Sequence, residues 1–386
     1  MLTKDIVQYI GHSLPIIDLI RLGSVSVELE KFLSSDQEFW QLKCSRYFLS
    51  VLAKDNIWKE YFVSNYMKVS IIGESDIELK DFKFKSISHS SHSLAIDLHD
   101  NLWTFGSNEE GQLCLGDKID RIFPVRVGCF KVKQVSAGGH SAFIDMEDNV
   151  WTFGWNEYGQ LGLGDNEDRN VPVQVEGFKA KSIIVGLYCT GIIDMDNRAW
   201  LCGSNHYGQL GSGYKIDNVV FTQVKHCKVQ QIAIGEDHIL LLDMHNNVWA
   251  SGSNRYGQLG LYSLHDDRTL FVQVPLIKAQ QIAAGTNHSV ILDMENNVWT
   301  CGSNYCGQLG LKGRQNRVSF NPIEQKAKQI SAGNYQTTII DMDNNVWVYG
   351  TGQEQVKFKE TNPMSVPNIK AQKISAGYGS IAIIRI

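Results

Sequence analysis

The chain has 386 residues, an apolar share of 43% and a formal net charge of −5. These values are ordinary for a globular protein with a large core, and there is no run of lysine or arginine that could follow a phosphate backbone. No apolar run reaches the roughly 18 to 20 residues needed to cross a bilayer, and the start of the chain lacks a signal-peptide hydrophobic region. We therefore expect an intracellular protein of the cytoplasm or nucleus, with no direct nucleic acid partner and no membrane contact.

The N-terminal part, residues 1–65, has apolar residues at helical spacing and no period-two alternation. Pro15 suits a helix start or a turn, and Ser35 with Glu38 three residues later forms a capping signal. Three or four short helices in such a segment make a small all-α domain, which is too small to be confidently stable alone.

The order of features in "HSLPIIDLIRLGSVSVELEKFLSSDQEFWQLK" resembles an F-box. The match lacks an earlier Leu-Pro, and "VSVEL" stands where Val-Cys-x-x-Trp is usual. The resemblance implies docking to a Skp1-like adaptor of a cullin ubiquitin ligase. By position the apolar contacts would be Leu14, Pro15, Ile17, Leu19, Ile20, Leu22 and Val25. Two alternatives stay open: these side chains form only the domain's own core, or the segment is a plain helical cap on the following domain.

A repeat of 48 to 50 residues organises the rest of the chain. It is marked by tryptophans, each six residues after an aspartate, at Trp103, Trp151, Trp200, Trp249, Trp299 and Trp347. A fixed period of this length indicates one supersecondary unit per repeat. In each unit an Asp-Asn or Asn-Asn turn separates two short apolar runs, which is a hairpin signal, and two further runs flank it. Four short strands per unit are typical of a propeller blade.

The two ends of the repeat region each supply half a unit. Residues 371–386 resemble the first half of a repeat, and residues 66–84 resemble the second half. Joined together they would make a seventh blade and leave no open edge strand. We therefore predict a mainly β protein in which residues 66–386 form a seven-bladed propeller after the small helical domain.

The repeat closely resembles a known family. The pattern A-G-x-x-H-S, apolar run, Asp, turn, V-W-x-x-G-x-N-x-x-G-Q-L-G is similar to the regulator of chromosome condensation repeat, and it runs from about residue 85 to the end. The resemblance implies a seven-bladed propeller.

The repeated polar residues do not form a catalytic pattern. The histidine of the repeat is replaced in three units, by Cys189, Gln336 and Ser380, so we expect it to make a structural hydrogen bond. Six equivalent aspartates, one per blade, are too far apart for paired acid and base work. The "GSNxxGQLG" glycines lack the following Lys-Ser or Lys-Thr of a phosphate loop. We expect no catalytic residue, no cofactor and no metal site.

The eight cysteines include no C-x-x-C pair, and we expect reduced, mostly buried thiols. The stretch "NNVWTCGSNYCGQLGL" holds two of them, Cys301 and Cys306. By register they fill positions where other repeats carry unrelated residues, which argues against a paired thiol site.

Two functions from different classes remain, and neither is an enzyme with its own catalytic site. The first is a substrate receptor, in which the F-box-like part recruits a ligase and propeller loops bind an unknown target protein. The second, implied by the family's founding member, is nucleotide exchange on a Ran-like small GTPase. The uniform spacing leaves little space for an inserted wedge, and no basic tail precedes the repeats. A plain scaffold is the third reading. The loops with most individual character are "DNEDRN", "LHDDR" and "KGRQNR", from Asp165, Leu264 and Lys312.

Overall fold

The computed structural model describes residues 69–72, 77–78, 84–350, 363–377 and 379–385. Within these ranges the chain is folded into β-strands and turns and contains no helix, and so none that could span a membrane. The predicted F-box-like segment and its seven apolar contact residues, from Leu14 to Val25, lie outside the described residues. The prediction of a mainly β fold is confirmed for the part described.

Twenty-two strands make up the described part of the chain. Three kinds recur in each repeat: two short strands of a hairpin and one long strand that follows the glycine-rich loop. The strands are β1 (Val69–Ile72), β2 (Ile77–Glu78), β3 (Phe84–His89), β4 (His92–Asp97), β5 (Asn101–Gly106), β6 (Arg121–Ala137), β7 (His140–Asp145), β8 (Asn149–Gly154), β9 (Arg169–Val185), β10 (Cys189–Asp194), β11 (Arg198–Gly203), β12 (Asn218–Ile234), β13 (His238–Asp243), β14 (Asn247–Gly252), β15 (Arg268–Ala284), β16 (His288–Asp293), β17 (Asn297–Gly302), β18 (Arg317–Ala332), β19 (Gln336–Asp341), β20 (Asn345–Gly350), β21 (Met364–Ala376) and β22 (Ile381–Arg385).

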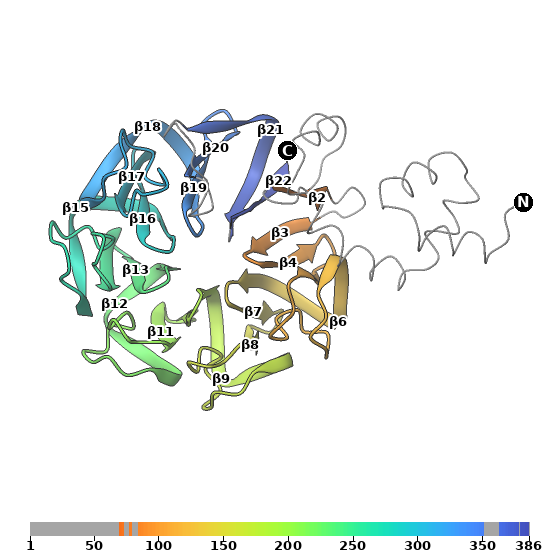
Figure 1. Ribbon diagram of the computed structural model, residues 1–386. Coiled ribbons are helices and arrows are strands. Elements are labelled where there is room, and N and C mark those ends of the chain that lie inside the picture. Colours follow the sequence, from red (N-terminus) through yellow and green to blue (C-terminus); the bar gives the residue numbers. More distant parts are fainter. Residues whose placement is uncertain (1–68, 73–76, 79–83, 351–362, 378, 386) are drawn as a thin grey trace, which may run out of the picture. The chain divides into compact units, whose positions relative to one another are not determined.

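Each long strand belongs to two neighbouring sheets. The first part of β6 pairs with β5, and its last residues, from Val132 on, pair with β7 of the next sheet. The strands β9, β12, β15, β18 and β21 are shared between two sheets in the same way. The described strands therefore form antiparallel sheets that follow one another around a ring, which is the nearly closed arrangement of a β-propeller (Figure 1).

The two ends of the described chain share one sheet. The last residues of β21 pair with β22, and β22 pairs along its other edge with β1, where Ile72 stands opposite Ile381. β1 then pairs with β2. Strands from opposite ends of the sequence thus supply the edge partners that a single repeat lacks.

Turn chemistry explains why the hairpins form where they do. Each hairpin between the two short strands has one residue with a φ of 64° to 68°, a region that asparagine and aspartate tolerate better than other side chains. These residues are Asp100, Asp148, Asn197, Asn246, Asn296 and Asn344. The hairpins predicted from Asp-Asn and Asn-Asn are confirmed at these positions.

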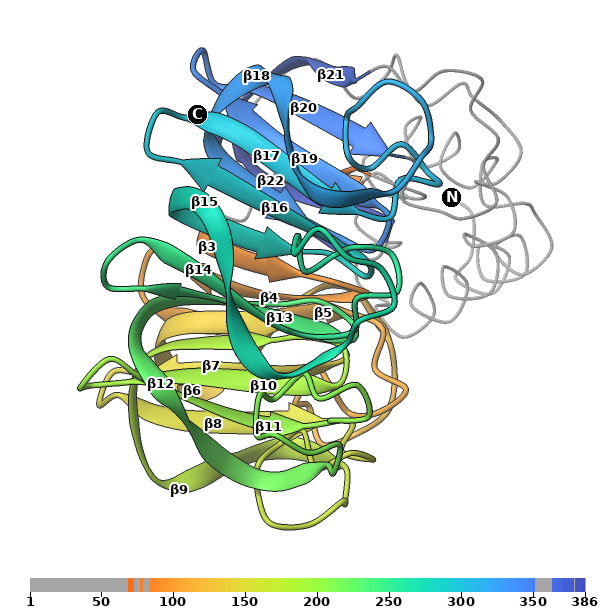
Figure 2. The same ribbon diagram turned by 90° about the vertical axis from the view of Figure 1, so that its left-hand side faces the viewer.

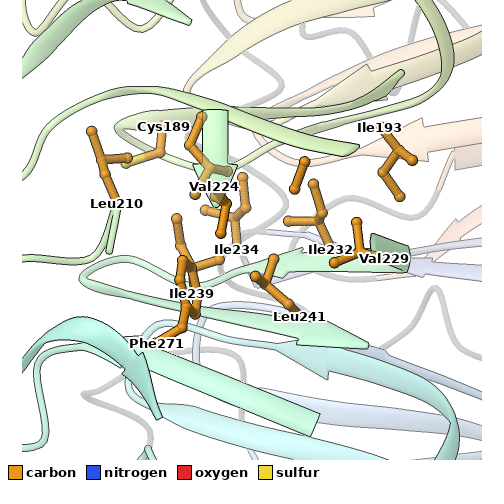
Figure 3. Packing of buried hydrophobic residues seen from close by; sticks show 12 residues of the cluster. Cys189, Ile193, Leu210, Val224, Val229, Ile232, Ile234, Ile239, Leu241 and Phe271 are labelled. Atoms are coloured by element: carbon orange, nitrogen blue, oxygen red, sulfur yellow. The ribbon is translucent and has the colours of Figure 1, made fainter. Parts of the chain in front are cut away.

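The apolar core lies between neighbouring sheets. Figure 3 shows one such cluster, in which Leu241 and Ile239 of β13 and Phe271 of β15 pack with Cys189 of β10 and with residues of β12. Strands of the β4 type are almost entirely buried, because each lies in the middle of its sheet and meets a neighbouring blade. Burying one such leucine or isoleucine contributes about 1.5 to 3 kcal/mol. The edge view in Figure 2 shows the blades side by side, with connecting loops at both ends of the strands.

Candidate functional site

The repeated aspartates brace the hairpin turns. In the second described repeat, Asp145 accepts hydrogen bonds from the backbone nitrogens of Glu147 and Asn149, from Asn149 Nδ2 and from Trp151 Nε1, at 2.8 to 2.9 Å. The tryptophan bond recurs at every repeat from Asp97 to Asp341. At Asp97, burial raises the carboxyl pKa, but these hydrogen bonds outweigh it and lower the pKa to about 2. The repeated aspartates are turn acceptors.

The repeated histidines link each sheet to the next. His92 Nε2 lies 2.6 Å from Ser141 Oγ, and that hydroxyl donates to the Gln112 carbonyl at 2.8 Å. The serine's proton is therefore used, and the histidine must donate its Nε2 proton. The same relay joins His238 to Ser289, at 2.9 Å. Burial lowers the pKa of His92 and His238 to about 3, so both are neutral near pH 7. The predicted structural hydrogen bond is confirmed.

Buried amides hold the glycine-rich loops. Asn156 is fully buried: its Nδ2 donates to the Asp165 carbonyl, its Oδ1 accepts from Leu161 N, and its own backbone nitrogen donates to Asp168 Oδ1. Asp165 also forms a 2.6 Å ion pair with Arg169. Asp165, Asp168 and Arg169 of the "DNEDRN" loop, singled out from the sequence, are therefore used in contacts within the propeller. In the other two loops, Asp267 accepts a hydrogen bond from the backbone nitrogen of Asn254, and Asn316 accepts one from the backbone nitrogen of Asn304.

The two cysteines of "NNVWTCGSNYCGQLGL" are structural. Cys301 on β17 is fully buried, and its thiol donates to the Gln258 carbonyl at 3.4 Å. Burial raises the pKa of this thiol. Gly302, which follows it, has a φ of 102°, and a Cβ there would come within 2.4 Å of the Asn287 carbonyl oxygen. Most described cysteines are buried, as predicted; Cys129 is exposed. No group of three metal-ligating side chains occurs among the residues described.

An aromatic cluster forms around Trp155, a departure from the repeat. Trp155, Tyr158 and Tyr188 contact one another edge to face, with ring centroids 5.4 to 5.6 Å apart. His206 continues the cluster, 5.6 Å from Tyr158. The three large rings are half-buried and His206 is exposed. Trp155 stands where the other repeats have Ser107, Ser204, Ser253 and Ser303.

Two adjacent carboxylates lie on the turn between β12 and β13, and one of them, Asp237, interacts electrostatically with His206 of the cluster. Burial raises the pKa of Glu236 to about 7, and the negative charge of Asp237 adds to the effect. Burial also raises the pKa of Asp237 to about 6; His206 opposes this rise and Asp267 adds to it. We call the residues Trp155, Tyr158, Tyr188, His206, Glu236 and Asp237 the aromatic-acidic patch.

A groove of about 400 Å³ lies between the first part of β15, which pairs with β14, and the next sheet, which contains β16 and β17. Pro275 and Leu276 line one side, and Met294, Trp299 and Phe320 line the other. Leu276 is 94% exposed and has a φ of 68°. The aromatic-acidic patch and this groove were both missed by the sequence analysis, although Trp155 in place of serine was a visible signal for the first.

A ring of antiparallel sheets built on a 48 to 50 residue repeat, with its repeated polar groups used internally, defines a β-propeller of the protein-interaction class. The repeat profile described as regulator of chromosome condensation (RCC1) repeat matches residues 99–144, 147–193, 196–242, 245–292 and 295–340. A second profile of the same description matches residues 229–258 and 279–308. The chain therefore belongs to the RCC1 repeat family.

Solved structures share this fold at low sequence identity. The protein is similar to yeast RCC1 (Prp20) bound to Kap60, with a TM-score of 0.73, 17% identity, and coverage of 83% of this chain and 89% of that one. Prp20p from Saccharomyces cerevisiae, in a structure whose description includes binding to Gsp1p and histones, is also similar. The TM-score is 0.73, the sequence identity is 18%, and the match covers 83% of this chain and 92% of that one. Human WBSCR16 matches with a TM-score of 0.72 and 16% identity, over 83% of this chain and 99% of that one. No curated protein sequence matches the chain.

Proposed function

We propose that this chain is a non-enzymatic protein-binding module whose propeller loops hold a partner protein. The observation that carries the proposal is the contrast between the two sets of polar residues. The repeated Asp, Asn and His side chains are used in hydrogen bonds within the propeller, as at Asp145, Asn156 and His92. The aromatic-acidic patch contains Trp155, where the other described repeats have serine, and it is partly exposed, which is where partner specificity is expected in a repeat scaffold.

A Ran-like small GTPase is the first partner class to test. The supporting observation is the shared fold with Prp20p, whose structure is described together with its binding to Gsp1p and histones. Because identity is 18%, the likeness supports a choice of partner to test and not an activity. The test is release of a fluorescent guanine nucleotide from a Ran-like GTPase by the full chain. Release at the intrinsic rate at every protein concentration would exclude exchange, while binding of the GTPase without release would leave a plain scaffold.

The F-box reading is a second proposal, supported by the residue order around Leu14 and Pro15. In it the N-terminal segment binds a Skp1-like adaptor, so that a ubiquitin ligase acquires the partner held by the propeller. The full chain should then retain the adaptor in a pull-down, and the double variant Leu14→Asp, Leu19→Asp should not. Equal retention by the double variant, or by a chain that starts at Lys68, would remove the ligase reading.

The general proposal is decided by affinity purification with mass spectrometry on the full chain and on a Trp155→Ser variant. We expect at least one partner that binds the full chain directly when the two purified proteins are mixed. The proposal fails when no direct partner is recovered by any form of the chain.

A further inference from the structure

The acidic half of the patch holds two carboxylates that no described residue pairs directly, although His206 offsets part of the charge of Asp237. Within the described chain, the carboxylates of Glu236 and Asp237 have no ion pair and no hydrogen bond. Neighbouring acids differ, because Asp217 lies 3.4 Å from His206 Nε2 and Asp267 forms a 3.2 Å ion pair with Lys215. Two adjacent, half-buried carboxylates repel each other and have lost part of their hydration. A cation beside them would relieve both costs.

The aromatic half of the patch provides a surface that suits the same cation. Trp155, Tyr158 and Tyr188 contact each other through edges as well as faces, and His206 connects Tyr158 to the acidic side. A lysine or arginine placed against an aromatic face gains about 0.5 to 2 kcal/mol, and most when water is excluded. The apolar stem of such a side chain can lie along the half-buried rings.

A buried amide donor below the patch also lacks a partner. Gln209 is fully buried, and its Nε2 has no hydrogen-bond partner among the described residues. A Cβ atom built on Gly252 would lie 2.3 Å from the Asp237 carbonyl oxygen and 2.9 Å from Gln209 Cβ, which places Gln209 beside the acidic turn. The equivalent amide one repeat later, Gln258 Nε2, reaches Asn287 Oδ1 at 3.5 Å. By this register Gln209 Nε2 lies towards the Asp237 turn, where as a donor it suits an oxygen acceptor and not the cation itself.

The tryptophan stands at a position where the repeat needs only a small polar side chain. The equivalent residues of the other described repeats are Ser107, Ser204, Ser253 and Ser303. The Trp155 ring is half-buried and contacts Tyr158 and Tyr188. A large, partly exposed ring in place of serine favours a role for the tryptophan in binding.

We infer that the aromatic-acidic patch binds a lysine or arginine side chain presented by a partner protein. The positive group lies against Glu236 and Asp237, and its apolar stem and the adjoining main chain lie on Trp155, Tyr158 and Tyr188. This inference rests on the proposed protein-binding function and names the chemistry of the partner. It commits to a basic protein segment, because the carboxylates set the sign of the charge and the rings favour a side chain with an apolar stem.

Short fluorescent Gly-Ser peptides that carry a pair of lysines, or a pair of arginines, are the probes. They are titrated with the full chain at low salt, and anisotropy gives the affinity. We expect both peptides to bind about tenfold more tightly than a peptide with norleucine in place of lysine, a difference of about 1.4 kcal/mol. Binding should weaken as salt is added, because exposed charge pairs are screened. Equal binding of the norleucine peptide would overturn the inference.

The variants separate charge from ring contact. The double variant Glu236→Gln, Asp237→Asn keeps side-chain shape and removes the charge, and Trp155→Ser restores the residue that other repeats carry. We expect each to lose most of the preference for the basic peptides. The matched control Glu167→Gln, Glu176→Gln removes two exposed carboxylates elsewhere and should bind as the parent does. Parent-like binding by the double patch variant would overturn the inference.

Failure of the inference and failure of the proposed function give different results. When a direct partner binds the parent chain and both patch variants equally, the protein-binding function stands and the basic-segment site is wrong. When no direct partner binds the parent chain, the proposed function is wrong. Circular dichroism and thermal unfolding of each variant show whether a loss of binding reflects a loss of fold.

Discussion

Cys189 and Ile239 occupy, in neighbouring sheets, the two positions at which other repeats place a hydrogen-bonded histidine and serine or threonine. At those repeats His92 meets Ser141, and His288 meets Thr337. Where the histidine is replaced by Cys189, the facing position is apolar, and both side chains are fully buried in the same core cluster (Figure 3). The replacement of histidine by Cys189 goes together with the replacement of the facing hydroxyl residue by Ile239, because a buried histidine without a hydroxyl partner would leave an unsatisfied donor.

A double-mutant cycle tests this coupling. Cys189→His alone should destabilise the fold by about 1 to 3 kcal/mol, because the Nε2 donor is buried opposite an isoleucine. Adding Ile239→Ser should recover part of the loss through a new inter-sheet hydrogen bond. The two changes should show a favourable interaction energy of about 1 kcal/mol in denaturant unfolding. Additive effects of the two changes would contradict the proposed relay.

Asp145→Ala should be strongly destabilising. The change removes the acceptor for four hydrogen bonds, including the one from Trp151 Nε1, from a side chain that is buried although its turn is exposed. We expect a loss of about 2 to 4 kcal/mol in the free energy of unfolding. Glu147→Ala in the same turn is the control, because the Glu147 side chain is exposed, and it should change the free energy by less than about 0.5 kcal/mol. Similar losses in both variants would refute the role of the aspartate.

The buried histidines should make the fold sensitive to mild acid. Burial lowers the pKa of His92, His140 and His238 to about 3 and that of His288 to about 4, below the ordinary value of 6.5. The unfolded chain therefore binds more protons, so stability is present above pH 6.5 and is lost as the pH falls towards the folded-state values. In this range each histidine should lower the free energy of unfolding by about 1 kcal/mol for every unit that the pH falls.

Urea unfolding at about pH 7.5 and about pH 5.5 measures this slope. His238→Gln is the informative variant, because the sixth repeat already has Gln336 at this position and bonds it to the Ser380 carbonyl. The variant should show a smaller loss of stability on acidification than the parent. An unchanged slope would mean that His238 does not contribute to the acid sensitivity.

The patch carboxylates should act in the opposite direction. Because burial raises the pKa of Glu236 to about 7 and that of Asp237 to about 6, the folded state favours their protonated forms. The stability that they contribute is therefore complete below about pH 4 and is lost as the pH rises through those values. The double variant Glu236→Gln, Asp237→Asn should melt at a higher temperature than the parent near pH 8 and close to it near pH 4. A lower melting temperature at the alkaline end would refute this assignment.

Leu276→Asn should stabilise the protein. Leu276 has a left-handed backbone and is almost fully exposed, and the equivalent positions in other repeats are Gly177 and Asn368, both with positive φ. Relief of the backbone strain should add about 1 kcal/mol to the free energy of unfolding. Leu276→Ala lacks the short polar side chain that lets asparagine hydrogen-bond locally in the left-handed region, and it should give little gain. A loss of stability in Leu276→Asn would show that the leucine packs favourably in the groove.

The local design of the propeller could be predicted from the sequence because its determinants are close together in the chain. The spacing from Asp145 to Trp151 defines a hairpin whose turn residues, side-chain acceptor and indole donor all lie within seven positions. The repeat length then indicated a propeller, and the substitution of Cys189 for histidine indicated a structural bond and not a ligand. These inferences needed no knowledge of how the sheets meet.

Only the tertiary structure decided which loop side chains gather. The sequence drew attention to charged loops such as the one at Asp165, but the structure shows that Asp165 is held by Asn156 and Arg169. The patch forms because long strands such as β9 and β12, which are shared by two sheets, bring the turns of successive sheets together, so that Tyr158 and Tyr188, from two repeats, become neighbours. Local spacing fixes a hairpin through short-range hydrogen bonds, whereas contacts between blades depend on the packing of whole sheets, which no single repeat encodes.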